Sequence, residues 1–409
     1  MRIFLFKTGG LGDNYGLGSY INGIVDAAKV NSEKFEFIVI EFNLTSKIEN
    51  IKSIKRNNIT VCKIPVAYHS INMYSDSLFP SSICTVLQDR YNLTRNDIFH
   101  FNSSMHYLLA KKIQEETGGA IIYTVHILLW KTIYKNEDQF LNEYKNKVHK
   151  NKLIAIHNEK DICKISKSII CMNSETKEYL SNVYKVNNNK IKKIPNGLLI
   201  KENDPRLERP LDLVKSELGF ANDKIILFVG RIDPEKGVFD LIKAFRKVVS
   251  RCKGIRLIVV GDGAISQALT LCKGIWSKVL FTGYVNDKLQ LLDLYRVADL
   301  MVLPSYHEQS SFTFLEAIKN KKPLIISDIP AFEKLDSNSC IKIGFVEDKK
   351  NDTKVINNRQ LEKAMVKLIT KPELAESLAQ QAFMTFETEF NLHSLFKSLI
   401  TVYKRNKLT

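Results

Sequence analysis

Two glutamates, Glu308 and Glu316, stand eight positions apart where an apolar segment gives way to a helix-forming one. Residues 300–303 are expected to form a strand that ends at Pro304, and a helix is expected from about Ser310. The first carboxylate would lie on a strand-to-helix loop and the second about two turns into the helix. Ligands of open α/β sheets bind where such loops and helix N-termini converge. The pair is therefore a candidate for binding two parts of one ligand. The alternative is that both glutamates lie on a solvent-exposed helix face without a ligand.

Two basic residues follow another expected strand in the same half of the chain. Residues 226–237 have the sequence ILFVGRIDPEKG, which places Arg231 at a strand end and Lys236 at the start of an amphipathic helix. The guanidinium fork and the mobile ammonium can together neutralise a diphosphate, and the helix start adds positive potential. The alternative is a structural pairing of Arg231 with Asp233, with Lys236 in solvent.

The first half of the chain offers weaker signals. A glycine-rich turn, GGLGDNYGLGS at residues 9–19, follows the first expected strand, and glycine lets the backbone approach a ligand closely. The spacing is neither a nicotinamide-binding nor a Walker pattern. His126 ends the expected strand 121–126, where a packed, hydrogen-bonded histidine is the alternative to a ligand contact. His100 has the same kind of placement.

Metal ligation is not expected. No Asp-x-Asp pair occurs to hold a metal–diphosphate, so the charge of a leaving group would have to be met by Arg231, Lys236 and helix N-termini. The seven cysteines are scattered and include no Cys-x-x-Cys, which argues against a zinc site or a disulfide framework.

The elements that must position these residues alternate between short apolar runs and helix-length stretches. Continuous apolar strands indicate parallel sheets covered on both faces. Two such series predict an α/β fold of two doubly wound, Rossmann-like domains that face each other across a cleft. The expected strands are 3–6, 35–41, 60–64, 97–101, 121–126 and 168–172, and then 225–229, 256–260, 279–282, 300–303, 323–327 and 341–345.

The expected domain boundaries follow from this alternation. An N-terminal domain is expected over residues 1–200, a linker over 201–222 and a second domain over 223–385. Residues 372–403 form one long helical stretch, and its part from 386 to 409 is expected to pack back on the first domain. No apolar run approaches the ~20 residues that span a bilayer, and residues 1–7 do not resemble a signal peptide, so a cytoplasmic location is expected.

The formal charge of +16 is partly concentrated in residues 145–193, which contain twelve lysines against four acids. An anionic membrane surface, an anionic substrate or a solvated lysine-rich face would each account for it. Nucleic acid is the weakest interpretation, because arginine is scarce there and no zinc-finger, RNP or helix-turn-helix pattern occurs.

Taken together, these segments resemble the GT-B glycosyltransferases, and specifically the retaining glycosyltransferase family 4. The likeness is strong over residues 225–335 and looser in the first domain. It is carried by the order and spacing of several segments. They are IPNG at 194–197, FVGR at 228–231 with KG at 236–237, VGDG at 260–263, FTGYV at 281–285, ADL at 298–300 with LPS at 303–305, the Glu308/Glu316 pair and the glycine loop YGLGSY at 15–20.

The resemblance implies a role for each candidate residue. Arg231 and Lys236 would bind the donor diphosphate and Gly16 would approach its phosphates. Ser310 and Ser311 depart from the family pattern, but their amides and hydroxyls could still bind a phosphate. Glu316 would bind the ribose hydroxyls. The catalytic positions would be Glu308, in contact with the transferred sugar, and His126, near its reacting end. The implied activity is a retaining, metal-independent transfer of the hexosyltransferase type, without a cofactor, from a nucleotide-sugar, UDP-linked by base rate. The acceptor would be a glycan, lipid-linked or protein acceptor of bacterial surface glycoconjugates.

The chain departs from the family pattern at three places. Gln309-Ser310-Ser311 replaces Gly-Phe-Gly after the first glutamate, Lys322 replaces a glycine before Pro323, and Ala331-Phe332 replaces a glycine pair. The last two changes are expected to reshape the sugar pocket. A GT-B sugar-nucleotide epimerase and a non-catalytic GT-B partner subunit are the alternatives to a transferase, and peripheral contact with an anionic membrane is a further expectation.

Overall fold

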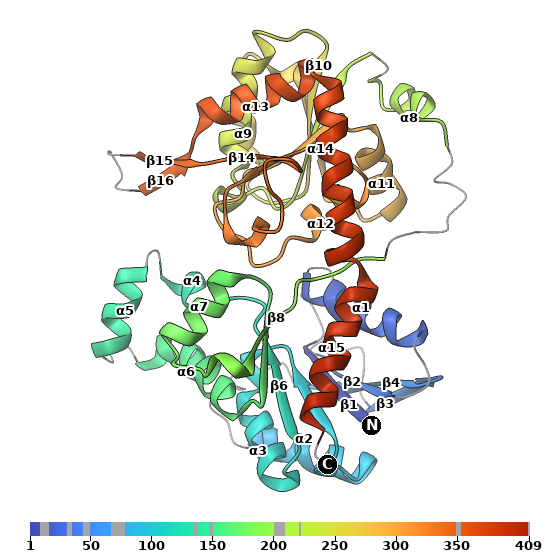
Figure 1. The fold of residues 1–409 in the computed structure, drawn as a ribbon, viewed down its shortest axis with the longest axis vertical. Coiled ribbons are helices and arrows are strands. Elements are labelled where there is room, and N and C mark those ends of the chain that lie inside the picture. Colours follow the sequence, from blue (N-terminus) through green and yellow to red (C-terminus); the bar gives the residue numbers. More distant parts are fainter. Residues whose placement is uncertain are drawn as a thin grey trace. The chain divides into compact units, whose positions relative to one another are not determined.

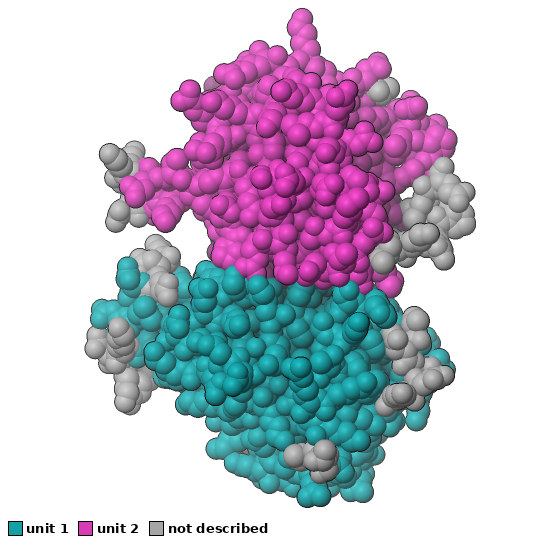
Figure 2. Space-filling model, in the orientation of Figure 1, with its two compact units in different colours: residues 1–197, 392–409 teal, residues 198–391 magenta. Residues whose placement is uncertain are grey.

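The computed structural model describes residues 1–8, 16–30, 35–43, 50–66, 78–134, 137–146, 150–199, 209–220, 222–348 and 353–407. The chain forms two compact units. Unit 1 comprises Met1–Gly197 and Leu392–Thr409, and unit 2 comprises Leu198–Asn391. Figure 2 colours them teal and magenta. Where the sequence suggested a linker over 201–222, residues 209–220 and 222 are part of unit 2, and 201–208 and 221 lie outside the described residues.

Unit 1 is built on a sheet in the order β3-β4-β2-β1-β5-β6-β7-β8, in which only the β3–β4 pair is antiparallel. Its central strands are buried on both faces, as the continuous apolar runs predicted. The strands are β1 Arg2–Thr8, β2 Glu36–Asn43, β3 Lys52–Arg56, β4 Ile59–Pro65, β5 Ile98–Phe101, β6 Ala120–Thr124, β7 Ser168–Cys171 and β8 Ile191–Lys193.

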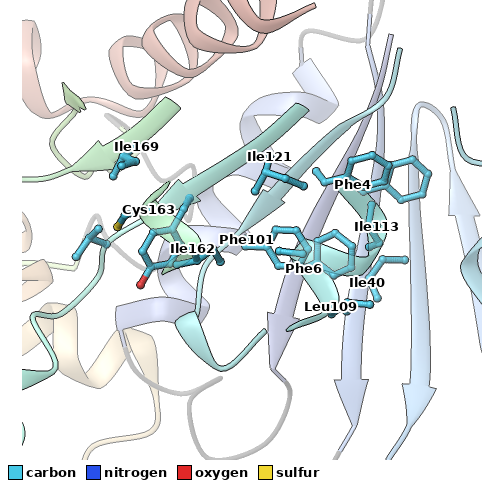
Figure 3. Packing of buried hydrophobic residues seen from close by; sticks show 14 of the residues in the cluster. Phe4, Phe6, Ile40, Phe101, Leu109, Ile113, Ile121, Ile162, Cys163 and Ile169 are labelled. Carbon is cyan, nitrogen blue, oxygen red and sulfur yellow. The ribbon is translucent and has the colours of Figure 1, made fainter. Parts of the chain in front are cut away.

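Helices cover both faces of this sheet (Figure 1). On one face Phe4, Phe6 and Phe101 pack with residues of α3 and α6, and Figure 3 shows part of this core. On the other face Phe37 contacts Phe396 and Tyr403 of the returning helix α15. The helices are α1 Gly16–Val30, α2 Leu78–Tyr91, α3 Tyr107–Thr117, α4 Trp130–Ile133, α5 Glu137–Asn146, α6 Lys150–Ile165, α7 Ser174–Asn182 and α15 Leu392–Asn406, with short 3-10 turns at Ser104–His106 and Asn188–Lys190.

Unit 2 is built on an all-parallel sheet in the order β11-β10-β9-β12-β13-β14, with a separate antiparallel hairpin, β15-β16. The order reverses between β9 and β12, which lie side by side. The strands are β9 Lys224–Val229, β10 Ile255–Val260, β11 Val279–Gly283, β12 Leu300–Leu303, β13 Leu324–Ser327, β14 Ile341–Ile343, β15 Phe345–Asp348 and β16 Thr353–Ile356.

Alternate residues of these strands enter two different cores. Ile226 and Phe228 pack with α9 and α13, whereas Ile225 and Leu227 pack with α11 and α12 on the opposite face (Figure 1). The helices are α8 Leu211–Glu217, α9 Val238–Val249, α10 Ile265–Thr270, α11 Lys288–Val297, α12 Phe312–Lys319, α13 Asn358–Thr370 and α14 Pro372–Thr385, with 3-10 turns at Pro234–Lys236, Trp276–Lys278 and Pro330–Phe332 and a π turn at Phe386–Phe390.

Several elements differ from the expectation. The helical stretch 372–403 is divided into α14 and α15 by the π turn, and unit 1 resumes at Leu392 rather than at 386. The strand expected over 341–345 ends at Ile343, because Phe345 begins the β15-β16 hairpin. Among the described residues, no helix combines the length and the apolar character that a membrane span requires.

Candidate functional site

The acidic and basic candidates of unit 2 lie at one edge of its sheet. Arg231 and Lys236 follow β9, and Glu308 follows β12, so both loops leave the carboxyl ends of adjacent parallel strands. This pair of strands is also where the strand order reverses. Ligands of open α/β sheets bind at such a switch point, because the loops on its two sides diverge and leave space between them.

The loop after β9 is held in a turn by its own side chains. The carboxylate of Asp233 accepts a hydrogen bond from the backbone N–H of Lys236 at 3.0 Å and caps the 3-10 turn Pro234–Lys236. Gly237 then adopts a left-handed conformation with φ of +66°. A methyl group at Gly237 would lie 1.9 Å from the carbonyl oxygen of Pro304, so only glycine lets this loop approach the end of β12.

This close approach brings the two loops into direct contact. The Lys236 ammonium lies 2.5 Å from a carboxylate oxygen of Glu308, and the Ser305 hydroxyl donates to the same oxygen at 3.0 Å. The Lys236 side chain is 22% exposed and the Glu308 side chain 11%. A partly buried pair of this kind is screened less by salt than a surface pair. Lys236, which was predicted to bind phosphate, therefore contacts Glu308, which was predicted to bind the sugar.

Arg231 is more exposed and makes looser contacts. Its guanidinium lies 3.1 Å from Asp233 and 3.8 Å from Glu235, and its side chain is 59% exposed. The alternative pairing of Arg231 with Asp233 is thus present in this structure. Exposed ion pairs contribute about 0–1 kcal/mol, so an anionic ligand with two acceptor oxygens can displace these carboxylates at little cost.

The neighbouring loops after β9 and β10 are joined through their backbones. The N–H of Ile232 donates to the carbonyl of Asp262 at 2.8 Å, and the N–H of Ala264 donates back to Ile232 at 2.7 Å. A methyl group at Gly261 would lie 1.9 Å from the carbonyl oxygen of Gly230. The loops that contain the FVGR and VGDG segments are therefore packed closely together through their backbones beside Arg231.

The helix α12 carries the second glutamate. The Ser311 hydroxyl accepts a hydrogen bond from the N–H of Phe314 at 3.2 Å and caps the N-terminus of α12. Ser311 therefore has a structural role in the helix. Glu316 lies in the following turn, and its carboxylate accepts a hydrogen bond from the Tyr295 hydroxyl at 2.6 Å. Tyr295 is buried on α11, and burial followed by the Glu316 charge raises the pKa of its phenol.

A tyrosine next to Glu308 connects the two loops further. The backbone N–H of Tyr306 donates to the carbonyl of Glu235 at 2.8 Å, and its hydroxyl donates to Asp240 of α9 at 2.9 Å. The N–H of Ile356 donates to the same hydroxyl at 3.2 Å. Burial raises the pKa of Tyr306 to about 12, so the hydroxyl keeps its proton and the connection persists at physiological pH.

Unit 1 places Gly16 and His126 at the carboxyl edge of its own sheet. Gly16 is exposed and is the first residue of α1, and residues 9–15 of the glycine turn lie outside the described residues. His126 lies two residues beyond β6, because that strand ends at Thr124 rather than at 126.

The contacts of His126 fix its protonation. The Asn102 amide donates to the carbonyl of Phe6 at 3.2 Å, which leaves its side-chain oxygen to accept from His126 Nε2 at 3.0 Å. The Tyr20 ring packs edge-on against the imidazole, with centroids 4.7 Å apart. Burial lowers the pKa of His126 to about 3, so the ring is neutral at physiological pH and carries its proton on Nε2.

His100 has a packing role. It is fully buried, and its ring nitrogens lie 2.7 Å from the Tyr403 hydroxyl and 2.6 Å from the Thr124 hydroxyl. Asn406 of α15 also donates to Ser168 at 2.9 Å. These buried polar contacts anchor the returning helix α15 on the unit 1 sheet.

Two of the departures from the family pattern lie elsewhere than expected. Lys322 precedes β13 and is therefore at the amino edge of the sheet, opposite to the edge that carries Glu308. Phe332 is fully buried and packs against Phe314, with ring centroids 4.9 Å apart. The expectation that Lys322 reshapes the sugar pocket is wrong, and the Phe332 side chain belongs to the core beneath α12.

Sequence reasoning did not identify the residues that hold the candidates in place. Ser305, Tyr306, Asp240 and Tyr295 act through contacts 3 to 66 positions distant along the chain. Ser305 and Tyr306 stand beside Glu308, and this proximity was an available signal. Nothing in the sequence connects Tyr295 with Glu316 before the fold brings α11 and α12 together.

Comparison with known proteins relates this chain to glycosyltransferases. Residues 212–384 match the family described as Glycosyl transferases group 1. An uncharacterized glycosyltransferase of Methanocaldococcus jannaschii is 25% identical over 324 residues, which cover 77% of each chain. The alpha-D-kanosaminyltransferase of Streptomyces kanamyceticus is 25% identical over 196 residues, 47% of this chain and 48% of that protein. The match to this second relative thus spans about half of its length.

Solved structures are similar over nearly the whole chain. Sucrose-phosphate synthase of Thermosynechococcus elongatus superposes with a TM-score of 0.75 at 16% identity and covers 99% of this chain and 98% of its own. HepE of Anabaena, in complex with UDP, superposes with a TM-score of 0.72 at 16% identity and covers 99% and 100%. This chain thus has the GT-B fold, and the likeness of residues 212–384 to the Glycosyl transferases group 1 family, together with the relatives named above, identifies it as an enzyme of the glycosyltransferase class.

Proposed function

We propose that this enzyme transfers a sugar from a UDP-sugar to a hydroxyl of a bacterial glycan or other glycoconjugate, with retention of anomeric configuration and without a metal ion. The observation that carries the proposal is the contact between Lys236 and Glu308 at the switch point of the unit 2 sheet. A cation and a carboxylate there supply both kinds of group that a sugar diphosphate requires.

The ion pair has a direct chemical consequence for donor binding. Lys236 and Arg231 are each paired with carboxylates in this structure. A diphosphate carries more charge and more acceptor oxygens than these partners, so it would draw both cations toward itself. Glu308 would then lose its ammonium partner and become available to accept a hydrogen bond from a sugar hydroxyl.

The other proposed roles follow the same geometry. Glu316, oriented by Tyr295, would accept hydrogen bonds from the two ribose hydroxyls. Ser310, and the Ser311 hydroxyl proton that capping leaves available, would donate to phosphate oxygens near the start of α12. Gly16 and His126 keep the roles implied by the resemblance, close approach to the phosphates and contact near the reacting end of the sugar.

In the proposed reaction the acceptor oxygen bonds to the anomeric carbon from the face that the diphosphate leaves. The bond between that carbon and the phosphate oxygen breaks, and the acceptor proton passes to the departing phosphate. Arg231 and Lys236 would stabilise the negative charge that develops on the diphosphate, which is the task a metal ion performs in other sites. His126, being neutral, would contribute hydrogen bonding but no charge.

The relatives support this donor and acceptor class. HepE is described in complex with UDP-glucose. Curated relatives include a UDP-Gal:alpha-D-GlcNAc-diphosphoundecaprenol alpha-1,3-galactosyltransferase of Escherichia coli, 24% identical over 286 residues. The alpha-monoglucosyldiacylglycerol synthase of Acholeplasma laidlawii, 27% identical over 195 residues, is named for a lipid product.

Product analysis tests the proposal. The enzyme would first be screened by thermal shift against UDP-sugars and other nucleotide-sugars, since a donor stabilises the folded state in proportion to the logarithm of its concentration over Kd. The stabilising donor would then be incubated with EDTA, with and without a panel of glycan and lipid-linked acceptors. We expect an α-linked product from an α-linked donor. An inverted linkage, an absolute need for a divalent metal, or interconversion of the donor sugar without acceptor would each contradict part of the proposal.

The basic surface of unit 1 supports a further element of the proposal, contact with an anionic membrane. Lys164, Lys167, Lys185 and Lys193 are exposed. Glu159, one of the four acids in this segment, is buried against Tyr184, and burial raises its pKa to about 8, so it offsets little of that charge. Co-sedimentation with phosphatidylglycerol vesicles but not phosphatidylcholine vesicles is expected. Equal binding to both would remove this element.

A further inference from the structure

A second cavity lies at the amino edge of the unit 2 sheet, the edge opposite to Glu308. Its volume is about 360 Å³, within the usual range for small-molecule pockets. One wall is formed where strands begin, by Lys224 of β9, Asp299 before β12 and Lys322 before β13. The other wall is formed by the end of α13 and by one face of α14, including Leu368, Pro372, Ala375 and Ala379.

Positive charge is in excess around this cavity. Its lining contains Lys224, Lys321 and Lys322 against Asp299 and Glu376. Asp299 is already engaged, because its carboxylate lies 2.9 Å from Lys224 and 3.5 Å from the nearby Lys215. It also accepts a hydrogen bond from the backbone N–H of Ile225. One carboxylate therefore serves several ammonium groups, and an additional anion would be attracted here.

Lys322 is the most constrained of these lysines. Its ammonium donates to the carbonyls of Arg296 at 2.8 Å and Ala298 at 3.0 Å. An ammonium has three N–H bonds, and the described part of the chain supplies no acceptor for the third. Burial lowers the pKa of Lys322 to about 8, and an anion beside its ammonium would favour the charged form.

Lys321 occupies an unusual backbone conformation. Its φ is +51°, a left-handed value that costs an L-residue about 1–2 kcal/mol and that glycine adopts freely. The side chain places its ammonium 4.5 Å from the centroid of the Phe383 ring, at the same turn as Lys322. Lys321 thus keeps a charged side chain at a turn whose backbone glycine would adopt more easily.

We propose that this cavity is a second binding site, separate from the donor edge, for a small organic phosphate such as a sugar monophosphate. A phosphate monoester carries about −1.5 to −2 charge and three acceptor oxygens, so it suits several lysines better than a single carboxylate does. The apolar face of α14 would contact the organic part of the ligand.

Isothermal titration calorimetry with glucose 1-phosphate tests the site. The variants are Lys321→Gly and Lys322→Met, and the matched control is Lys236→Met at the opposite edge of the same sheet. We expect both amino-edge variants to weaken binding about tenfold or more, as the loss of one charge-assisted contact predicts, and Lys236→Met to bind as the wild type does. Inorganic phosphate should bind more weakly than glucose 1-phosphate, and glucose should give no heat.

Thermal unfolding separates binding from folding in the same variants. Lys321→Gly removes a charge and relieves the left-handed strain, so it should unfold at the same temperature as the wild type or higher while binding is lost. Absence of binding to the wild type at millimolar ligand would overturn the proposal. So would loss of binding in Lys236→Met with retention in Lys321→Gly, which would place the phosphate at the donor edge. Equal affinity for inorganic phosphate would refute the claim that the organic part of the ligand contributes to binding.

Discussion

The two units present different chemistry at the same edge of similar sheets. At the carboxyl edge of unit 2, charged groups face one another, with Lys236 against Glu308 and Arg231 against Asp233. At the carboxyl edge of unit 1, the candidate is a neutral histidine that donates to an amide oxygen. In the proposed reaction, unit 2 would therefore contribute charge stabilisation and unit 1 orientation through neutral hydrogen bonds. A doubly wound sheet provides the place for a site but leaves its electrostatics to the loops.

The comparison is tested most severely by replacing the candidate catalytic residue at each edge. Glu308→Gln should lower kcat about 10³-fold, because the amide cannot supply the carboxylate charge, while UDP affinity changes less. His126→Gln, which retains a hydrogen-bond donor, should lower kcat only about tenfold. Steady-state kinetics with the donor found by thermal shift would measure both. Similar losses for the two variants would contradict the division of tasks between the units.

The rigidity of the unit 2 edge is tested by Gly237→Ala. The new methyl group would meet the Pro304 carbonyl, so we expect the free energy of unfolding to fall by about 3 kcal/mol and the loops bearing Lys236 and Glu308 to separate. Gly219→Ala is the matched control. Gly219 has a similar φ of +72°, but a methyl group there has no neighbour within 4 Å, so about 1 kcal/mol is expected. Urea unfolding curves would show equal losses if the close approach were unimportant.

A smaller effect is expected at the ribose position. Tyr295→Phe removes the hydroxyl that orients Glu316, and should weaken UDP binding about fivefold to tenfold. Binding of 2′-deoxyUDP should weaken less, because it makes fewer contacts with that carboxylate. Calorimetry with both nucleotides measures the difference. An equal loss for the two nucleotides would indicate a general packing effect and would remove Glu316 from the ribose site.

The smallest effect concerns pH and distinguishes the interiors of the units. Burial lowers the pKa of His100 and His126 to about 3 and that of His106 to about 4, and all three lie in unit 1. Between pH 6.5 and these values the unfolded chain binds protons that the folded unit does not, so stability falls as pH falls. Glu159, with a pKa raised to about 8, acts in the opposite direction, because its folded form takes up a proton first. The net loss from pH 7 to 5.5 should be on the order of 1 kcal/mol.

Fluorescence can follow this loss in unit 1 separately. The chain has two tryptophans, Trp130 in unit 1 and Trp276 in unit 2. Trp130 is 7% exposed and should shift its emission on unfolding, whereas Trp276 is already 55% exposed and should change little. The emission midpoint should move to lower temperature as the pH falls. A midpoint independent of pH in the wild type, or one that moves equally in His106→Leu, would contradict the assignment.

Much of the fold could be predicted where buried strands appear in the sequence as apolar runs. Strands β9, β10, β12 and β13 of unit 2 are mostly apolar and buried, and each was expected within about two residues. The unpredicted strands lack that signal. All five residues of β3 are exposed, β8 has one buried residue among three, and the β15-β16 hairpin has one among eight. Such strands form because a neighbouring edge or turn pairs with them.

The candidate site likewise has features that could be predicted from the sequence and features that could not. The placement of Arg231, Lys236 and Glu308 after strand ends, and of Glu316 on the following helix, could be predicted from motif spacing. The Lys236–Glu308 contact could not, since it depends on how closely Gly237 approaches Pro304 in three dimensions. Lys322 shows the opposite error. It was assigned to the sugar pocket by its position in the pattern, although the strand direction places it at the other edge.

The backbone contacts between Gly230, Gly261 and their neighbours also limit how this enzyme can diversify. Where carbonyl oxygens and α-carbons touch, an inserted or enlarged residue in the loops after β9 or β10 would separate the strands themselves. The loop after β12 has no such glycine contact within its Gln309-Ser310-Ser311 segment. Attempts to redirect the enzyme to another donor by directed evolution should therefore accumulate changes after β12, with the two glycine loops kept almost unaltered.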